Sequence, residues 1–182
     1  VPGKWGYRCT GMTFLNFIKI VELVINDGHD PRTGMTLYQG NGTLLDFENF
    51  DDLWKSWEKN IAYYTRLSVA LDVLADTHLE EFPDILCSSL IDSCIERGKT
   101  AKEGGAKYDI IAGLQVGLSN AANAMYALKK TVFEDKILTK EEVFEALKNN
   151  FEGIEGERIR NILLNVPKYG NDIDEVDEFA EQ

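Results

Sequence analysis

The 182-residue sequence predicts an α/β fold that is mainly helical, with one or two strands. Apolar residues recur at helical spacing in about six segments. One short run, YDIIAGL at 108–114, instead has the length and the branched apolar content of a buried strand, and a helical pattern follows it. Because a single strand cannot form a sheet, this strand is expected to pair with strands of a longer chain or of another molecule.

The first half of the chain contains two predicted helices joined by an irregular connection. Residues 12–27, MTFLNFIKIVELVIND, are apolar on nearly every side and precede Gly28, which predicts a buried helix. Residues 28–44 are dense in Gly, Asp, Pro and Asn and predict a long connection. Asn49 can cap the next and longest helix, whose apolar stripe is Leu53, Trp57, Ile61, Tyr64, Leu67, Leu71 and Leu74.

The second half contains four further predicted helices. Residues 83–98 predict one helix that carries Cys87 and Cys94 on the same side. The others are expected at about 117–133, after a capping box of Thr139 and Glu142, and at about 155–165. In the closing PKYGND stretch, Gly170 and Asn171 are expected to form a turn and Asp172 to cap the residues after it.

Composition excludes several function classes. The net charge of −12, from 31 acidic and 19 basic residues, disfavours nucleic acid and anionic lipid as partners. No apolar run is long enough to span a bilayer, and the first residues do not resemble a signal peptide. Three cysteines without a CxxC pair agree with a reducing compartment. These features predict a cytoplasmic protein without a membrane or nucleic-acid partner.

Residue types alone predict no catalytic, cofactor-binding or metal-binding residue. His29 and His78 have no second ligand at zinc spacing. The acidic residues at 172–177 could offer oxygen ligands to calcium, but an EF-hand loop needs Gly and Glu at positions where this sequence has neither. The serines lack a G-x-S-x-G elbow, and the glycines at 104–105 lack Walker spacing.

Seven stretches of the sequence form an ordered series of motifs. They are VPGKWGYRCTGMTFLNF (1–17), LVINDGHDPRTG (23–34), DSCIERGK (92–99), GGAKYD (104–109), LQVGLSNAANAMYALKKTVFED (114–135), NNFEG (149–153) and PKYGND (167–172). Together they cover almost the whole chain, and their order and intervals resemble those of the glycyl radical enzymes related to pyruvate formate-lyase. Within that family they resemble the dehydratase-type branch, also called PflD, most.

This resemblance implies a ten-stranded α/β barrel wrapped in helices, of which residues 1–182 would be part of the pyruvate formate-lyase domain. The complete protein would be a homo-oligomeric lyase, dehydratase or formate acetyltransferase-like C-acetyltransferase of anaerobic metabolism. An S-adenosylmethionine-dependent activating enzyme would place a radical on a backbone glycine. A cysteine thiyl would then act on a small-molecule substrate held in the barrel.

The two radical-bearing loops of the family are not found among these residues. A Gly-Cys-(Val/Ile)-Glu loop is expected just before Val1, and an Arg-Val-(Ala/Ser)-Gly-Tyr loop, in the glycine radical domain, well beyond Gln182. The chain is therefore expected to be an interior fragment, inactive alone and without a bound cofactor. It is also expected to expose apolar surface along 12–25 and 110–128 and to self-associate. Cys9 lacks the required context, so the resemblance gives it no catalytic role.

The resemblance also implies pocket residues. The segment after the cysteine loop faces the substrate in relatives, so Thr10, Met12 and Phe14 are expected to line the pocket of the complete enzyme. Packing into the barrel wall is an equally consistent role for each of them. Met12 stands near a position where several relatives carry Tyr, which leaves the substrate open. A non-catalytic helical interaction module that keeps the family scaffold is the alternative function, and a calcium-binding domain is the weakest.

Overall fold

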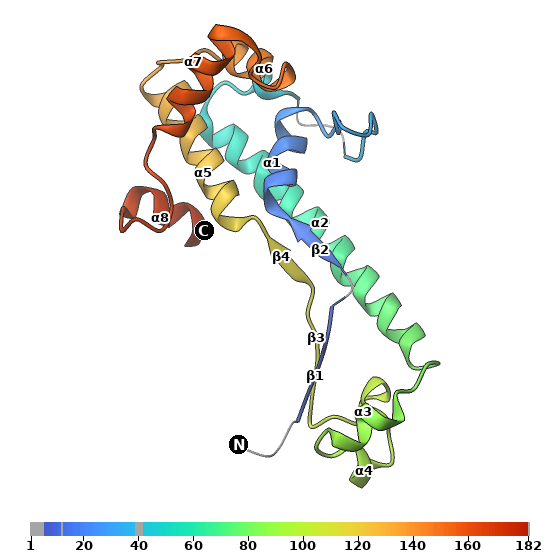
Figure 1. Ribbon diagram of the computed structural model, residues 1–182. Coiled ribbons are helices and arrows are strands. Elements are labelled where there is room, and N and C mark those ends of the chain that lie inside the picture. The colour runs from blue at the N-terminus through green and yellow to red at the C-terminus, as the bar shows by residue number, and fades with distance from the viewer. Residues whose placement is uncertain (1–5, 12, 39–41, 182) are drawn as a thin grey trace. The chain divides into compact units, whose positions relative to one another are not determined.

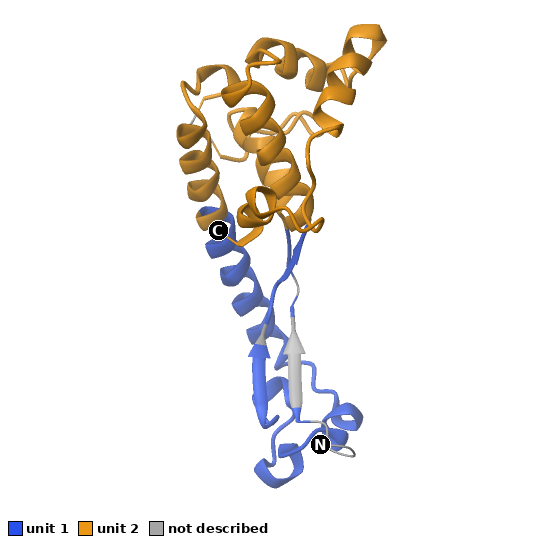
Figure 2. Ribbon diagram, turned by 90° about the vertical axis from the view of Figure 1, so that its left-hand side faces the viewer, with its two compact units in different colours: residues 1–15, 63–116 blue, residues 16–62, 117–182 orange. Residues whose placement is uncertain are grey.

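The computed structural model describes residues 6–11, 13–38 and 42–181. The chain forms two compact units, and each is built from two separate stretches of sequence (Figure 2). Unit 1 comprises residues 1–15 and 63–116, and unit 2 comprises residues 16–62 and 117–182. Figure 1 labels the elements along the chain.

Unit 2 is helical. Helix α5 (Leu118–Leu128) packs against α1 (Phe17–Ile25) and α8 (Asp174–Glu181), and α6 (Lys140–Lys148) packs against α7 (Gly153–Leu164). Its core side chains are almost completely buried and come from all parts of the unit, among them Val24, Leu44, Leu53, Met125, Leu138, Val143 and Val176. Its elements are α1 (Phe17–Ile25), the short 3₁₀ helix η1 (Leu44–Asp46), the first part of α2 (Phe50–Leu79), α5 (Leu118–Leu128), the π-helical turn η3 (Lys129–Glu134), α6 (Lys140–Lys148), α7 (Gly153–Leu164) and α8 (Asp174–Glu181).

Helix α1 begins later than the sequence predicts. Residues 14–16 form strand β2 (Phe14–Asn16), in which Phe14 and Asn16 are exposed and Leu15 is buried. This alternation has the period of a strand, and the Asn16 side chain then caps α1 by accepting from the Lys19 N–H at 3.4 Å. The predicted helix over 12–27 is therefore wrong at 14–16 and confirmed over 17–25, and it ends two residues earlier than predicted.

Helix α2 begins as predicted. The Asn49 carboxamide accepts from the Asp52 N–H at 3.0 Å. Within unit 2 its stripe is buried at Leu53 and Trp57, whereas Leu67, Leu71 and Leu74 in unit 1 are each close to half exposed. The predicted buried stripe is thus confirmed only in its first half. Although α2 has 30 residues, no described helix, α2 included, combines the length and hydropathy that crossing a membrane requires.

Unit 1 contains most of the strand structure. Strands β1 (Tyr7–Thr10) and β3 (Tyr108–Ile111) form a parallel pair, with Tyr7 opposite Tyr108 and Thr10 opposite Ile111. Strand β4 (Leu114–Val116) pairs with β2 in a second two-stranded sheet. The predicted strand at 108–114 is confirmed over 108–111, whereas Leu114 begins β4, and the described chain has four strands rather than one or two. The three missed strands have only three or four residues, too few for a periodic signal.

The single helix predicted over 83–98 is wrong. It consists of α3 (Ile85–Leu90) and α4 (Cys94–Arg97), separated by an extended Ile91 and by Ser93, whose φ is +78°. The 3₁₀ helix η2 (Ala101–Glu103) follows. Ile91, Cys94, Ala101 and Ala106 form a small core, and burial raises the pKa of the Cys94 thiol. Cys87 is exposed, so the two cysteines do not share a side.

The closing stretch forms the predicted turn, but its cap differs. Gly170 has a φ of +84°, and its N–H donates to the Asp177 carboxylate at 2.9 Å. The Ile173 carbonyl accepts the first hydrogen bonds of α8, so Ile173, not Asp172, precedes the helix. Helix α8 itself was not predicted. Within the described ranges, no three His, Cys, Asp or Glu side chains are grouped closely enough to hold a metal ion, the closing acidic residues included.

The expected exposure of apolar surface is confirmed in part. Most of α1 is buried, and so is α5 from Ala121 onward, against the expectation for these segments. The exposed apolar side chains lie instead in the strands and just after them, at Phe14, Ile110, Leu114, Val116 and Leu118.

Candidate functional site

The carboxyl ends of β1 and β3 in unit 1 form the candidate site. Parallel strands end at one edge of their sheet, and Thr10 and Ile111 are the last paired residues of this edge. In α/β proteins with parallel strands, ligands bind beyond the carboxyl ends of the strands. Gly11 and Thr13 after β1 and residues 112–114 after β3 therefore make up the candidate site of unit 1.

A buried carboxylate holds the first of these segments. Asp72, on α2, accepts from the Thr13 N–H at 3.0 Å and from the Thr13 hydroxyl at 2.8 Å, and it is only 4% exposed. The Thr13 hydroxyl also lies 2.5 Å from the Ser68 hydroxyl. Ser68 and Asp72 are four residues apart on α2, so they share one face of the helix. Both carboxylate oxygens of Asp72 thus bind Thr13, one through its backbone N–H and the other through its hydroxyl.

The second segment, residues 112–114, packs against Thr13 and Asp72. The Leu114 N–H donates to the Thr13 carbonyl at 3.0 Å. A side chain at Gly113 would place its Cβ 2.9 Å from Oδ2 of Asp72, closer than such atoms approach each other. We call Thr13, Ser68, Asp72 and Gly113 the strand-end clamp.

Of the predicted pocket residues, Phe14 directly follows Thr13 of the clamp, and Thr10 ends the strand before it. Thr10 is the last residue of β1, and Phe14 is the first residue of β2. The Phe14 side chain is 68% exposed. Met12 and the side chain of Thr10 lie outside the described residues. That the three line a substrate pocket stays a prediction. Ser68 and Asp72 were not predicted, because polar residues on a long helix give no signal of burial.

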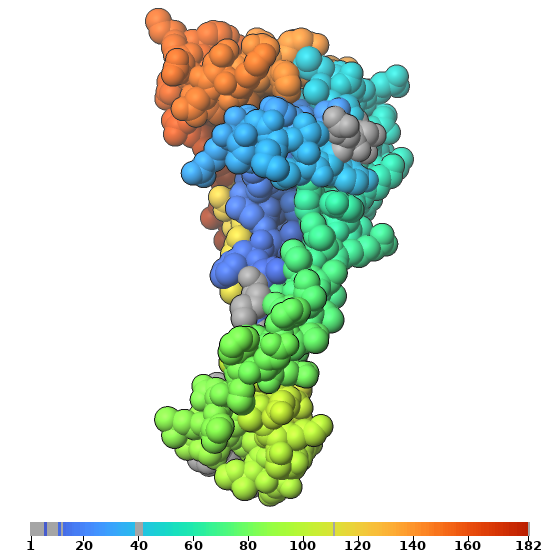
Figure 3. Space-filling model, turned by 90° about the vertical axis from the view of Figure 1, so that its right-hand side faces the viewer, coloured from blue at the N-terminus to red at the C-terminus, as the bar shows by residue number. Residues whose placement is uncertain are grey.

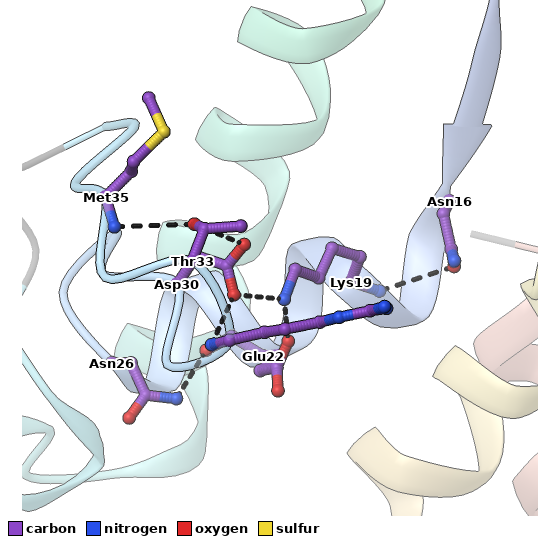
Figure 4. Close-up of polar contacts among 8 residues, drawn as sticks. Asn16, Lys19, Glu22, Asn26, Asp30, Thr33 and Met35 are labelled. Carbon is purple, nitrogen blue, oxygen red and sulfur yellow. Dashed lines mark hydrogen bonds and ion pairs between the residues drawn. The ribbon is translucent and has the colours of Figure 1, made fainter.

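A second polar cluster, in unit 2, surrounds Asp30 (Figure 4). The Asp30 carboxylate accepts from the Lys19 ammonium at 2.7 Å, and from the Arg32 N–H and the Thr33 hydroxyl at 2.9 Å each. Lys19 also forms an ion pair with Glu22. The hydrogen bond from Lys19 is the main cause that holds the pKa of Asp30 well below its usual range. Burial acts to lower the pKa of Lys19, but its bonds to Asp30 and Glu22 outweigh it and raise that pKa.

The Asp30 cluster shapes the connection after α1. The Asp30 N–H donates to the Met35 carbonyl, and the Gly34 N–H donates to the Asp30 carbonyl, each at 2.8 Å. The residues around this buried carboxylate, 31–37, are exposed, and the connection lies on the surface of unit 2 (Figure 3). The irregular connection predicted at 28–44 is confirmed over its described residues, and hydrogen bonds to the Asp30 carboxylate, together with these backbone bonds, order residues 30–35. We assign this cluster a structural role.

Replacing Asp30 with Asn should make unit 2 less sensitive to acid. A carboxyl whose pKa is lowered by folding stabilises the folded state fully above its unfolded pKa, about 4, and loses this contribution as the pH falls below that value. The D30N variant should therefore be less stable than the parent at neutral pH, with the difference shrinking toward about pH 3. Urea unfolding followed by fluorescence across this range measures it.

Asp51→Asn, which removes the same charge from an exposed position on α2, is the control for this measurement. A stability difference between D30N and the parent that stays constant at all pH values would contradict the assigned role of the carboxylate.

Unit 2 also contains an apolar groove of about 620 Å³ between α1, α5, α6 and α7. Its volume lies in the range of ligand pockets. Lys168 lies at its margin and donates to the Leu163 carbonyl at 3.2 Å, and burial lowers the pKa of this ammonium group. The remaining lining is mostly aliphatic, including Val21, Ile25, Leu128, Val143 and Leu147.

Comparison with known proteins identifies the family. The model of the pyruvate formate lyase-like family matches residues 1–182. The chain is 46% identical over 181 residues to the probable dehydratase YbiW of Escherichia coli (strain K12), covering 97% of this chain and 22% of that protein. It is 32% identical to trans-4-hydroxy-L-proline dehydratase of Clostridioides difficile, and the match covers 99% of this chain and 23% of that protein. The chain thus spans less than a quarter of the length of these curated relatives.

Solved structures agree with these relatives. The hydroxyproline dehydratase of Clostridioides difficile matches with a TM-score of 0.85 at 32% identity, over 98% of this chain and 22% of that chain. A protein of Roseburia inulinivorans described for 1,2-propanediol dehydration matches with a TM-score of 0.83 at 36% identity, over 99% and 23%. The B12-independent glycerol dehydratase of Clostridium butyricum matches with a TM-score of 0.82 at 33% identity, over 98% of this chain and 22% of that chain. The predicted mainly helical α/β fold is confirmed, and the chain belongs to the pyruvate formate lyase-like family of glycyl radical enzymes, on its dehydratase-type branch.

Proposed function

We propose that the complete protein containing this chain is a glycyl radical dehydratase, and that this chain supplies part of its substrate-pocket wall. The observation that carries the proposal is the agreement of nearly the whole chain with three dehydratases at TM-scores of 0.82 to 0.85. The strand-end clamp supports the pocket assignment, because it holds Thr13, which lies between Thr10 and Phe14 in sequence, just beyond the carboxyl end of β1.

The proposed substrate is a small molecule that carries a hydroxyl group. The relatives named for dehydration act on 1,2-propanediol, glycerol, trans-4-hydroxy-L-proline and (2S)-3-sulfopropanediol, and each of these has a hydroxyl that dehydration removes. Thr10, Met12 and Phe14 would offer a hydroxyl, a thioether and an aromatic ring to such a molecule. A few polar groups in a largely apolar wall are typical of small-molecule sites.

The proposal places the radical chemistry on residues other than those of this chain. Neither a Gly-Cys-x-Glu nor an Arg-Val-x-Gly-Tyr stretch occurs in the 182 residues. The complete protein would receive its glycyl radical from an S-adenosylmethionine-dependent activating enzyme and would work as a homo-oligomer. Sulfite-lyases and decarboxylases are also among the relatives, so a lyase that cleaves a different bond is the nearest competing activity.

Anaerobic co-expression of the complete polypeptide with its activating enzyme tests the proposal. Electron paramagnetic resonance would measure the organic radical, and turnover would be assayed on 1,2-propanediol, glycerol, trans-4-hydroxy-L-proline and (2S)-3-sulfopropanediol, with isethionate and pyruvate plus coenzyme A as comparisons. We expect dehydration of one hydroxylated substrate. A radical-bearing protein that cleaves only isethionate or pyruvate would contradict the proposal, and a folded protein that forms no radical would favour the non-catalytic interaction module.

A further inference from the structure

We propose that Asp72 is a positioning residue for the substrate pocket: acting through Thr13, it sets the place of the segment from Thr10 to Phe14. The inference rests on the proposed function, because it needs that segment to meet the substrate. Asp72 lies on helix α2, 58 positions after Phe14 (72 − 14), so it is not part of the segment that it would position.

Every polar group of Thr13 has a partner. Its N–H and its hydroxyl both donate to Asp72, at 3.0 and 2.8 Å, and its hydroxyl is also 2.5 Å from that of Ser68. Its carbonyl accepts from the Leu114 N–H at 3.0 Å. Since the backbone and the side chain are both bound, Thr13 cannot turn or slide without breaking several hydrogen bonds at once. Its two neighbours in sequence are Met12 and Phe14.

The clamp demands a carboxylate of this length. Asp72 is 4% exposed, and a buried charge is tolerated only when hydrogen bonds satisfy it. Hydrogen bonds to a charged acceptor are about twice as strong as neutral ones, and they are stronger still away from water. An Asn side chain could still accept from the Thr13 N–H, but it would present an amide N–H to the Thr13 hydroxyl, which would then have to accept instead of donate, and both bonds would lose their charged acceptor. A longer side chain would press on Gly113, whose Cα has no room for a Cβ beside Oδ2.

Loss of the clamp should therefore displace the pocket segment without removing any residue that touches substrate. A displacement of about 1 Å at a reacting centre can cost about 10²-fold in rate. A merely structural carboxylate would instead change the amount of folded protein and leave the folded molecules equally active. A positioning role therefore predicts a lower kcat/KM per mole of radical in the variant, whereas a merely structural role predicts a lower yield of folded protein at unchanged kcat/KM.

The test compares Asp72→Asn, Thr13→Val and Ser68→Ala in the complete protein with its activating enzyme. Asp30→Asn is the matched control, since Asp30 also accepts from a backbone N–H and a Thr hydroxyl but lies in unit 2. Each variant is assayed for kcat and KM per mole of radical, on the substrate that the parent dehydrates. Hydrogen exchange of peptides covering residues 11–15 provides a readout that needs no substrate.

We expect D72N to lower kcat/KM per radical by about 10- to 100-fold, T13V and S68A to lower it less, and D30N to leave it within about two-fold. Exchange at 11–15 should rise in D72N and not in D30N. Equal effects of D72N and D30N on kcat/KM, or faster exchange at unchanged kcat/KM, would overturn the positioning role. Unchanged exchange in D72N would overturn the clamp itself. If the parent dehydrates no substrate, the proposed function and the catalytic role fail together, while exchange still decides whether the clamp exists.

Discussion

Replacing Leu44 with Ala is expected to lower the free energy of unfolding of unit 2 by about 3 kcal/mol. Leu44 lies in η1 and has no exposed surface, and this short helix packs against α6. Removing its isobutyl group loses the transfer free energy of the buried carbons and leaves a cavity, because the surrounding structure relaxes only in part.

Leu45→Ala is the matched control for this prediction. Leu45 is the next residue of the same short helix, but its side chain is 37% exposed. Its carbonyl accepts from the Lys140 ammonium at 2.8 Å, and this contact survives the substitution because it is a backbone group. We expect L45A to cost less than about 1 kcal/mol.

Urea unfolding followed by tryptophan fluorescence measures both variants, since Trp54 and Trp57 both belong to unit 2. Similar losses for L44A and L45A would contradict the burial that separates these two neighbours.

Local signals in the sequence predicted the parts of the fold that local interactions determine. The capping box of Thr139 and Glu142 is present, with the Thr139 hydroxyl accepting from the Glu142 N–H at 3.1 Å and the Glu142 carboxylate accepting from the Thr139 N–H at 2.7 Å. The cap at Asn49 and the start of α5 just after Gly117 were also predicted. In each case the groups that make the bond lie within three or four residues of one another.

Features set by distant partners were not predictable. The break between α3 and α4 places Cys94 in a core with Ala101 and Ala106 while Cys87 stays exposed, and no periodicity distinguishes this from one continuous helix. Strand β1, with the sequence YRCT, is defined by its pairing with β3, about a hundred residues later. Short strands owe their existence to such partners rather than to their own residues.

The candidate site was predictable only in part and for the same reason. The resemblance located the segment from Thr10 to Phe14, because its motif is contiguous in sequence. The residues that hold this segment, Ser68 and Asp72, are separated from Thr13 by 55 and 59 positions. Only the structure shows that Asp72 is buried and that both side chains form hydrogen bonds with Thr13.

Replacing Gly28 with Ala is expected to be among the most destabilising single changes in unit 2, with a loss of about 3 kcal/mol or more. Gly28 has a φ of +74°, its N–H donates to the Leu23 carbonyl at 2.7 Å, and its carbonyl accepts from the Leu37 N–H at 2.9 Å. A Cβ at this position would overlap the carbonyl group of Tyr38. The connection must therefore shift away, which breaks its bonds to the end of α1.

Gly34→Ala separates the two causes of this loss. Gly34 lies in the same connection with a nearly equal φ of +72°, but no atom lies within 4 Å of the position its Cβ would take. Only the cost of a left-handed backbone applies there, about 1 kcal/mol. Urea unfolding should therefore show G28A losing at least about 2 kcal/mol more than G34A. If both variants lose the same free energy of unfolding, the left-handed backbone alone explains why glycine is needed at position 28. The close approach of Tyr38 would then make no separate contribution.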